Sequence, residues 1–264
     1  MDRDPTTVPL AELDRLWDFD DPEGSERRFA ELVPRARDER NGAFLAECLT
    51  QLARARGLLQ RFDEADATLF DAEAVLRPDD ARGRARIDLE RGRVANTAER
   101  DGRGRTCFLA AWEVARAAGE DALAVDAAHM LGIVEPPDLA WEWNERGMDL
   151  ARGSPDPAAR RWIASIANNM GWARHDAGAH GEALELFTLA LAERQRQDDP
   201  RRTRIARWCV ARCLRSLGRT EEALAARRAP PRYVRASGDS ARRTSARSGF
   251  CEGRPGAAAP RAPG

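Results

Sequence analysis

The chain has 264 residues, of which 42% are hydrophobic and 33% are charged, and its formal net charge at pH 7 is −1. Ala, Leu, Arg and Glu are abundant, whereas the β-branched and aromatic residues that favour strands are sparse, so the composition favours an all-α fold. Lys is absent, a bias that we attribute to a GC-rich gene rather than to nucleic-acid binding. Five scattered Cys argue against a disulfide framework. The absence of an apolar leader and of an apolar stretch of about 18 residues argues against secretion and membrane insertion, so we expect a cytoplasmic location.

The segments that favour helices follow one another in a regular order. Within the N-terminal segment 1–24 we expect a short helix at 10–17. A second helix is expected from an N-cap at Ser25 to Asp38, kinked at Pro34. Five pairs of helices follow, with Pro and Gly punctuating the chain between pairs. Their expected ranges are 41–57 with 62–76, 81–100 with 104–118, 121–134 with 138–152, 157–177 with 181–197, and 201–217 with 220–229.

A spacing of small residues recurs through these pairs. In four of the five pairs, a small residue in the first helix is followed twelve positions later by another in the second helix: Ala53 with Ala65, Gly92 with Gly104, Gly171 with Ala183, and Ala211 with Ala223. The second helices then continue with a bulky residue four positions on and a small one three further. These triplets are Ala65, Leu69 and Ala72; Gly104, Phe108 and Ala111; and Ala183, Phe187 and Ala190. Small residues at a crossing let two helices approach closely, and the three-and-four spacing places all of them on one face.

The third pair departs from this pattern. After Leu131-Gly132 the chain reaches Pro136-Pro137, which cannot continue a helix. We therefore expect a shortened first helix and a rigid turn. The second helix is expected to carry the same stripe at Ala140, Asn144 and Gly147.

The segment MGWARHDAGAHGEALELFTLALAER, from Met170 to Arg194, resembles the tetratricopeptide repeat through Met170-Gly171, Gly178, Ala183, Phe187 and Ala190. The resemblance extends over 25–229, with a repeat near forty residues. It implies a right-handed α-α superhelix of antiparallel helix pairs, in which first helices line a concave groove that binds peptides or partner proteins.

Polar and aromatic side chains on the first helices are the candidates for such a groove. They are Arg54, Arg86, Arg93, Asn96, His129, Asn168, Trp172, His175, Trp208 and Arg212, with Thr50 beside Arg54. One interpretation is an ordinary solvated helix face. The other is a groove for an extended acidic segment, with Arg and Asn pairing to carboxylates and backbone.

No catalytic or metal-binding pattern stands out, and we expect no cofactor. His175 and His180 lie five apart, which fits no zinc spacing, and Cys209 with Cys213 lack a second pair of ligands. The seven Trp are expected to be mostly core residues.

The helical pattern ends at Ala229. Residues 230–264 are mainly Arg, Ala, Pro, Gly and Ser, and from Arg227 onward nine Arg face two acidic residues. Such a segment cannot bury enough apolar surface to order itself, so we expect a disordered basic tail. An alternative is that the tail is translated out of frame, because shifted frames of GC-rich genes give the same residues.

The sequence thus predicts a non-catalytic scaffold that binds a partner protein or peptide, with no nucleic acid and no membrane involved. An alternative is a regulatory or sensor repeat module that acts in trans on a bacterial signalling or transcription partner. The sequence does not indicate the oligomeric state.

Overall fold

The computed structural model describes residues 13, 15–38, 42–100 and 102–228. The helices run in this order: α2 (Pro22–Asp38), α3 (Gly42–Leu58), α4 (Phe62–Ala74), α5 (Ala81–Thr97), α6 (Arg103–Ala118), α7 (Asp121–Val134), α8 (Pro137–Gly153), α9 (Pro157–Arg160), α10 (Ile163–Asp176), α11 (His180–Arg196), α12 (Pro200–Ser216) and α13 (Thr220–Arg228). The described residues contain no strand, which confirms the all-α prediction. None of these helices is both long enough and apolar enough to cross a membrane.

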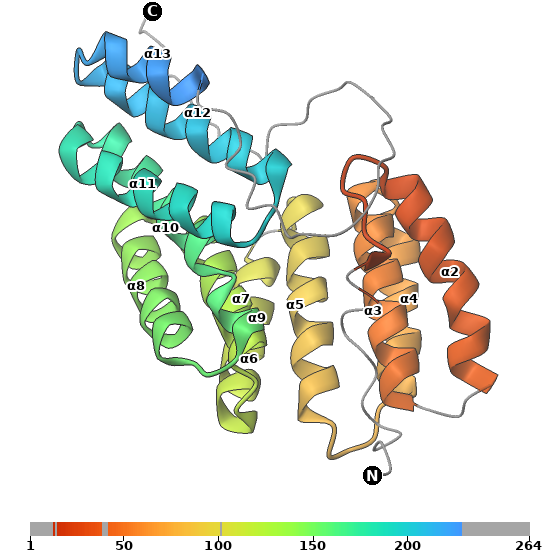
Figure 1. Ribbon diagram of the computed structural model, residues 1–264. Coiled ribbons are helices and arrows are strands. Elements are labelled where there is room, and N and C mark those ends of the chain that lie inside the picture. The colour runs from red at the N-terminus through yellow and green to blue at the C-terminus, as the bar shows by residue number, and fades with distance from the viewer. Residues whose placement is uncertain (1–12, 14, 39–41, 101, 229–264) are drawn as a thin grey trace, which may run out of the picture. The chain divides into compact units, whose positions relative to one another are not determined.

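Consecutive helices pack as pairs, as Figure 1 shows. The pairs are α3 with α4, α5 with α6, α7 with α8, α10 with α11, and α12 with α13. Each second helix also packs against the first helix of the next pair, and the first helices α3, α5, α7 and α10 contact one another in succession. This is the connectivity of a helical-repeat protein, in which each pair buries the apolar face of its neighbour.

A left-handed residue joins the two helices in four of the five pairs. Gly178 and Gly218 have φ of 78° and 74°, and Gln60 and Glu99 occupy the matching turns with φ of 60° and 53°. Each of them lies seven residues after the small residue of its first helix. Glycine enters this conformation without steric cost, whereas the other two residues do not. The turn geometry is therefore set by the repeat rather than by glycine alone.

The residues assigned to repeat packing are buried. They are Ala53, Ala65, Leu69, Ala72, Gly92, Phe108, Ala111, Gly171, Ala183, Phe187, Ala190 and Ala223. The two glycines face an aromatic ring of their own pair: a Cβ on Gly171 would lie 2.7 Å from Phe187 Cε1, and one on Gly92 would overlap the ring of Phe108. Glycine is required at both positions because a ring fills the space that a side chain would need.

The third pair has a different register from the expected one. A Cβ on Gly132 would lie 2.5 Å from Asn144 Nδ2, so Asn144 takes the position that Ala65 and Ala183 hold elsewhere. Met148 and Ala151 follow it as buried residues, whereas Ala140 is only partly buried. Of the stripe expected at Ala140, Asn144 and Gly147, the last two residues are buried and Ala140 is not. The register was wrong because Asn144, a buried polar residue, stands where a small one was sought.

Two helix boundaries also differ from the expected ones. Helix α2 begins at Pro22, and Asp21 caps it by accepting the Gly24 amide at 2.9 Å. Ser25 lies inside the helix, fully buried, and its hydroxyl donates to the Asp18 carbonyl at 2.9 Å. The helix expected at 157–177 is divided into α9 and α10 by a turn.

Two expectations fall largely or wholly outside the described residues. These are the short helix at 10–17, apart from residue 13 and residues 15–17, and the tail at 230–264.

Candidate peptide-binding face

The ten groove candidates lie on the first helices of the five pairs. Arg54 is on α3; Arg86, Arg93 and Asn96 are on α5; His129 is on α7; Asn168, Trp172 and His175 are on α10; and Trp208 and Arg212 are on α12. We call the surface formed by these ten residues the inner face. Side-chain contacts join neighbouring first helices across it, as between Arg93 of α5 and Asp126 of α7, and between Trp172 of α10 and Trp208 of α12.

The N-terminal half of the inner face is a network of ion pairs. Arg93 pairs with both Glu90 and Asp126, and Arg86 Nε lies 3.2 Å from Glu47 Oε2. All three carboxylates are buried, with Glu90 fully inaccessible to solvent. Arg54 Nη1 lies 3.9 Å from Glu90 Oε1. Arg82 pairs with both Glu47 and Glu120, so the network holds four cations and four anions. Buried charges require such pairing because an isolated one would lose its hydration without compensation.

Burial and neighbouring charges shift the titration of this network. Burial, helped by the positive charge of Arg93, lowers the pKa of Arg54 to about 10. Burial alone would raise the pKa of Asp126, but Arg93 and Arg54 outweigh it and hold this pKa below its ordinary value. Arg54 therefore stays protonated and Asp126 stays ionised at neutral pH.

This pairing changes the interpretation of Arg86 and Arg93. As groove residues they were expected to meet the carboxylates of an acidic ligand, but each already has a carboxylate of the same chain as its partner. Their side chains are only 16% and 12% exposed. They join α3, α5 and α7 to one another, and little of their charge remains for a ligand.

The C-terminal half of the inner face is aromatic and polar. The rings of Trp172 and Trp208 lie 5.9 Å apart, and Trp208 keeps 46% of its surface exposed. His175 packs edge-on against Trp172 at 5.3 Å, and its Nε2 lies 3.0 Å from Ser216 Oγ on α12. We call Trp172, His175 and Trp208 the aromatic patch.

Amide groups border the aromatic patch on α10. Asn168 Oδ1 accepts a hydrogen bond from the Cys209 thiol at 3.4 Å. The neighbouring Asn169 Nδ2 is shielded from solvent and has no hydrogen-bond partner among the described residues. A buried donor without a partner costs free energy, and because Asn169 Nδ2 is shielded it is not available to a ligand.

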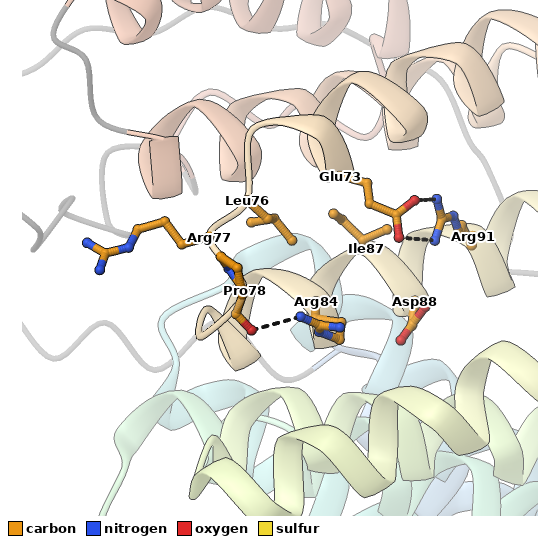
Figure 2. A pocket seen from close by; sticks show the side chains of 8 residues that line it. All are labelled: Glu73, Leu76, Arg77, Pro78, Arg84, Ile87, Asp88 and Arg91. Atoms are coloured by element: carbon orange, nitrogen blue, oxygen red, sulfur yellow. Dashed lines mark hydrogen bonds and ion pairs between the residues drawn. The ribbon is translucent and has the colours of Figure 1, made fainter.

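A separate hollow lies between α4 and α5, shown in Figure 2. Arg91 Nη2 donates to Glu73 Oε2 at 2.6 Å, and Arg84 donates to the Pro78 carbonyl at 3.0 Å. The hydrogen bond from Arg91 lowers the pKa of Glu73. The polar groups that line the hollow therefore pair with one another. They connect α4 of the first pair to α5 of the second pair. Elsewhere in the described chain, no three His, Cys, Asp or Glu side chains come together as a metal site would need.

No protein-family model and no curated protein matches this chain. Among solved structures, BtubC (BKLC) from P. vanneervenii aligns with a TM-score of 0.58 at 16% identity, over 88% of this chain and 99% of that one. The apo form of the quorum sensor NprR from B. thuringiensis aligns with a TM-score of 0.55 at 15% identity, over 82% of this chain and 66% of that one. The chain has a tetratricopeptide-like helical-repeat fold. At these identities the likeness concerns the fold and not the ligand.

Sequence reasoning missed the carboxylates of the inner face. Glu47, Glu90 and Asp126 were not singled out, although Glu90 and Arg93 lie three apart on one helical face. That spacing is the local signal that could have found one pair. The pairs between helices had no such signal, because they depend on how α3, α5 and α7 stack.

Proposed function

We propose that this chain is a divergent tetratricopeptide-repeat protein that binds an extended segment of a partner protein on the inner face and performs no chemistry itself. The observation that carries the proposal is the aromatic patch, where Trp208 is 46% exposed beside Trp172. Large exposed Trp side chains are unusual on a solvated helix face and are the typical anchors of protein interfaces.

The surroundings of the aromatic patch suit an extended peptide. Asn168 lies one helical turn before Trp172 on α10, and Arg212 lies one helical turn after Trp208 on α12. Apolar side chains of a ligand would pack on the rings while its backbone pairs with the Asn168 amide. The ion pairs of the N-terminal half hold the first helices in place.

Display of random peptides followed by affinity measurement tests this function. Peptides selected on the immobilised protein are measured by fluorescence polarisation against the wild type, Trp208→Ala and Phe70→Ala. Phe70 is the matched control because it is 69% exposed on α4, away from the inner face. Loss of an anchoring Trp costs about 2 kcal/mol or more, so Trp208→Ala should weaken binding about thirtyfold and Phe70→Ala should not. Equal affinities for all three proteins would reject the inner face as the binding surface.

A second proposal keeps the same surface but makes the chain a sensor or regulatory module acting in trans. It is motivated by the similarity in fold to the quorum sensor NprR. Genes for a kinase or transcription regulator beside this one, and co-purification of that product with the wild type but not with Trp208→Ala, would favour it. Partners unrelated to signalling would favour the scaffold.

A further inference from the structure

The segment that precedes α2 lies against α3 and covers Arg54, one residue of the inner face. Trp17 Nε1 donates a hydrogen bond to Gln51 Oε1 of α3 at 2.8 Å. The Arg54 guanidinium lies over the rings of both Trp17 and Phe19, with its carbon 5.4 Å from each ring centroid. The two rings stack at 4.8 Å with an interplanar angle of 4°. A residue selected as a ligand-binding candidate, Arg54, is therefore already covered by aromatic side chains of the same chain.

The same segment also reaches the last pair of helices. Asp20 Oδ1 lies 2.7 Å from Arg201 Nη2 in the first turn of α12, and Arg202 lies over the Phe19 ring at 5.9 Å. In Figure 1 the turn before α2 approaches the beginning of α12. Residues 17–20 thus bridge the first helix of the first pair and the first helix of the last pair.

Charge complementarity explains why an acidic segment lies there. The beginning of a helix carries the positive end of its dipole, and α12 adds Arg201 and Arg202 with no acidic residue in its first turn. The Asp199 side chain caps this helix by accepting the Arg202 amide, so it offsets only part of the charge. The Asp20 carboxylate supplies a further negative charge at this end.

The two ends of the segment are held with different strength. Trp17 packs against Phe29 of α2 at 5.0 Å, and the Ser25 hydroxyl fixes the backbone at Asp18. Phe19 and Asp20 are exposed and depend on surface contacts, which are individually weak in water. The outer half of the segment can therefore leave the inner face while the base stays anchored.

We propose that residues 17–20 are a clasp that covers Arg54 of the inner face and the beginning of α12, and that a partner segment carrying an aromatic ring beside a carboxylate displaces it at Arg54 and Arg201. That a partner segment binds at all rests on the proposed function. Its chemistry is inferred from the clasp, because the aromatic ring and the carboxylate of the clasp are the groups that this part of the surface accepts. The clasp lowers the apparent affinity for a partner by the fraction of time that it is closed.

The contact between clasp and α12 is tested without any partner. The chain contains no Lys, so Arg201→Lys provides a single side-chain amine for carbodiimide coupling to a neighbouring carboxylate. Mass spectrometry of the digested protein should find the amine introduced by Arg201→Lys joined to the Asp20 carboxylate. Arg204→Lys is the matched control, because Arg204 is exposed on the same helix and makes no ion pair with a carboxylate of the described residues. A link to Asp20 from both variants or from neither overturns the clasp.

Competition is tested with a fluorescein-labelled synthetic peptide of residues 15–22. Phe19→Ala with Asp20→Asn should bind it about tenfold more tightly than the wild type, as expected for a clasp closed about nine-tenths of the time. Phe70→Ala with Asp71→Asn, an exposed aromatic–acid pair on α4, should bind like the wild type. Equal binding by the clasp variant and the wild type overturns the proposal. Because coupling to Asp20 needs no ligand, failure of the proposed function alone would leave the cross-link intact.

Discussion

Replacement of Gly171 by Ala tests whether close packing of a ring selects glycine in the first helices. A Cβ at this position would lie 2.7 Å from Cε1 and 2.8 Å from Cδ1 of Phe187, closer than real carbon atoms approach. The Phe187 ring is fully buried and packs against Trp172 at 5.1 Å, so it has little room to move. Gly181 is the matched control, because it lies in the first turn of α11 of the same pair and a Cβ there would meet nothing within 4 Å.

Two opposing effects set the change in the free energy of unfolding that we expect for Gly171→Ala. Ala in a helix is more favourable than Gly by about 1 kcal/mol. Overpacking a tight core costs about 1–3 kcal/mol, and the immobile ring places Gly171→Ala in the upper part of that range. We therefore expect Gly171→Ala to lower the free energy of unfolding by about 1–2 kcal/mol. Gly181→Ala has only the first effect and should raise it by about 0.5–1 kcal/mol.

Urea denaturation followed by circular dichroism measures both variants. For a domain of this size, the expected loss corresponds to a fall in melting temperature of about 2–8 °C. Adding Phe187→Leu to Gly171→Ala should restore part of the loss, because a smaller side chain makes room for the new methyl group. If Gly171→Ala is as stable as the wild type, the ring shifts freely and close approach does not explain the glycine.

The remaining predictions concern the ion-pair network, a thiol and a helix crossing. Arg93→Ala should lower the free energy of unfolding by about 3–5 kcal/mol, because Glu90 and Asp126 lose a buried partner; a change under 1 kcal/mol in urea denaturation would show that water replaces the guanidinium. Because the pKa of Asp126 is lower in the folded state than its ordinary 3.8, its contribution to stability is present above that pH and is lost as the pH falls through the lowered value. Asp126→Asn should therefore flatten the pH dependence of unfolding below about pH 4, and an unchanged profile would contradict the pairing. Burial raises the pKa of the Cys209 thiol to about 11, so alkylation of the folded protein at about pH 8 should be about a hundredfold slower than in urea; equal rates by mass spectrometry would contradict its burial. Ala183→Leu should cost about 1–3 kcal/mol at a crossing where the alanine is fully buried, and a melting shift under about 2 °C would say that the register is wrong.

The sequence predicted the helix hairpins and their close contacts wherever two small residues lie twelve positions apart. The positions of Gly92 and Gly171, twelve residues before Gly104 and Ala183, predicted both the hairpins and the close packing. In the third pair the twelve-residue spacing also holds, between Gly132 and Asn144, but the triplet was assigned in the wrong register because Asn144 is not a small residue. That a buried amide takes the place of an alanine here is visible only once the two helices are placed together.

The sequence by itself determined that the chain is all helical, that its helices come in pairs, and which small residues lie where the helices of a pair meet. It could do so because turns, caps and helical faces are properties of neighbouring residues. Only the tertiary structure decided which cations of the first helices already have a carboxylate partner. Arg93 meets Asp126, and Arg201 meets Asp20, because the stacking of successive pairs brings distant segments together. The sequence shows which residues are charged, but the partner of each charged side chain and its exposure depend on the packed fold.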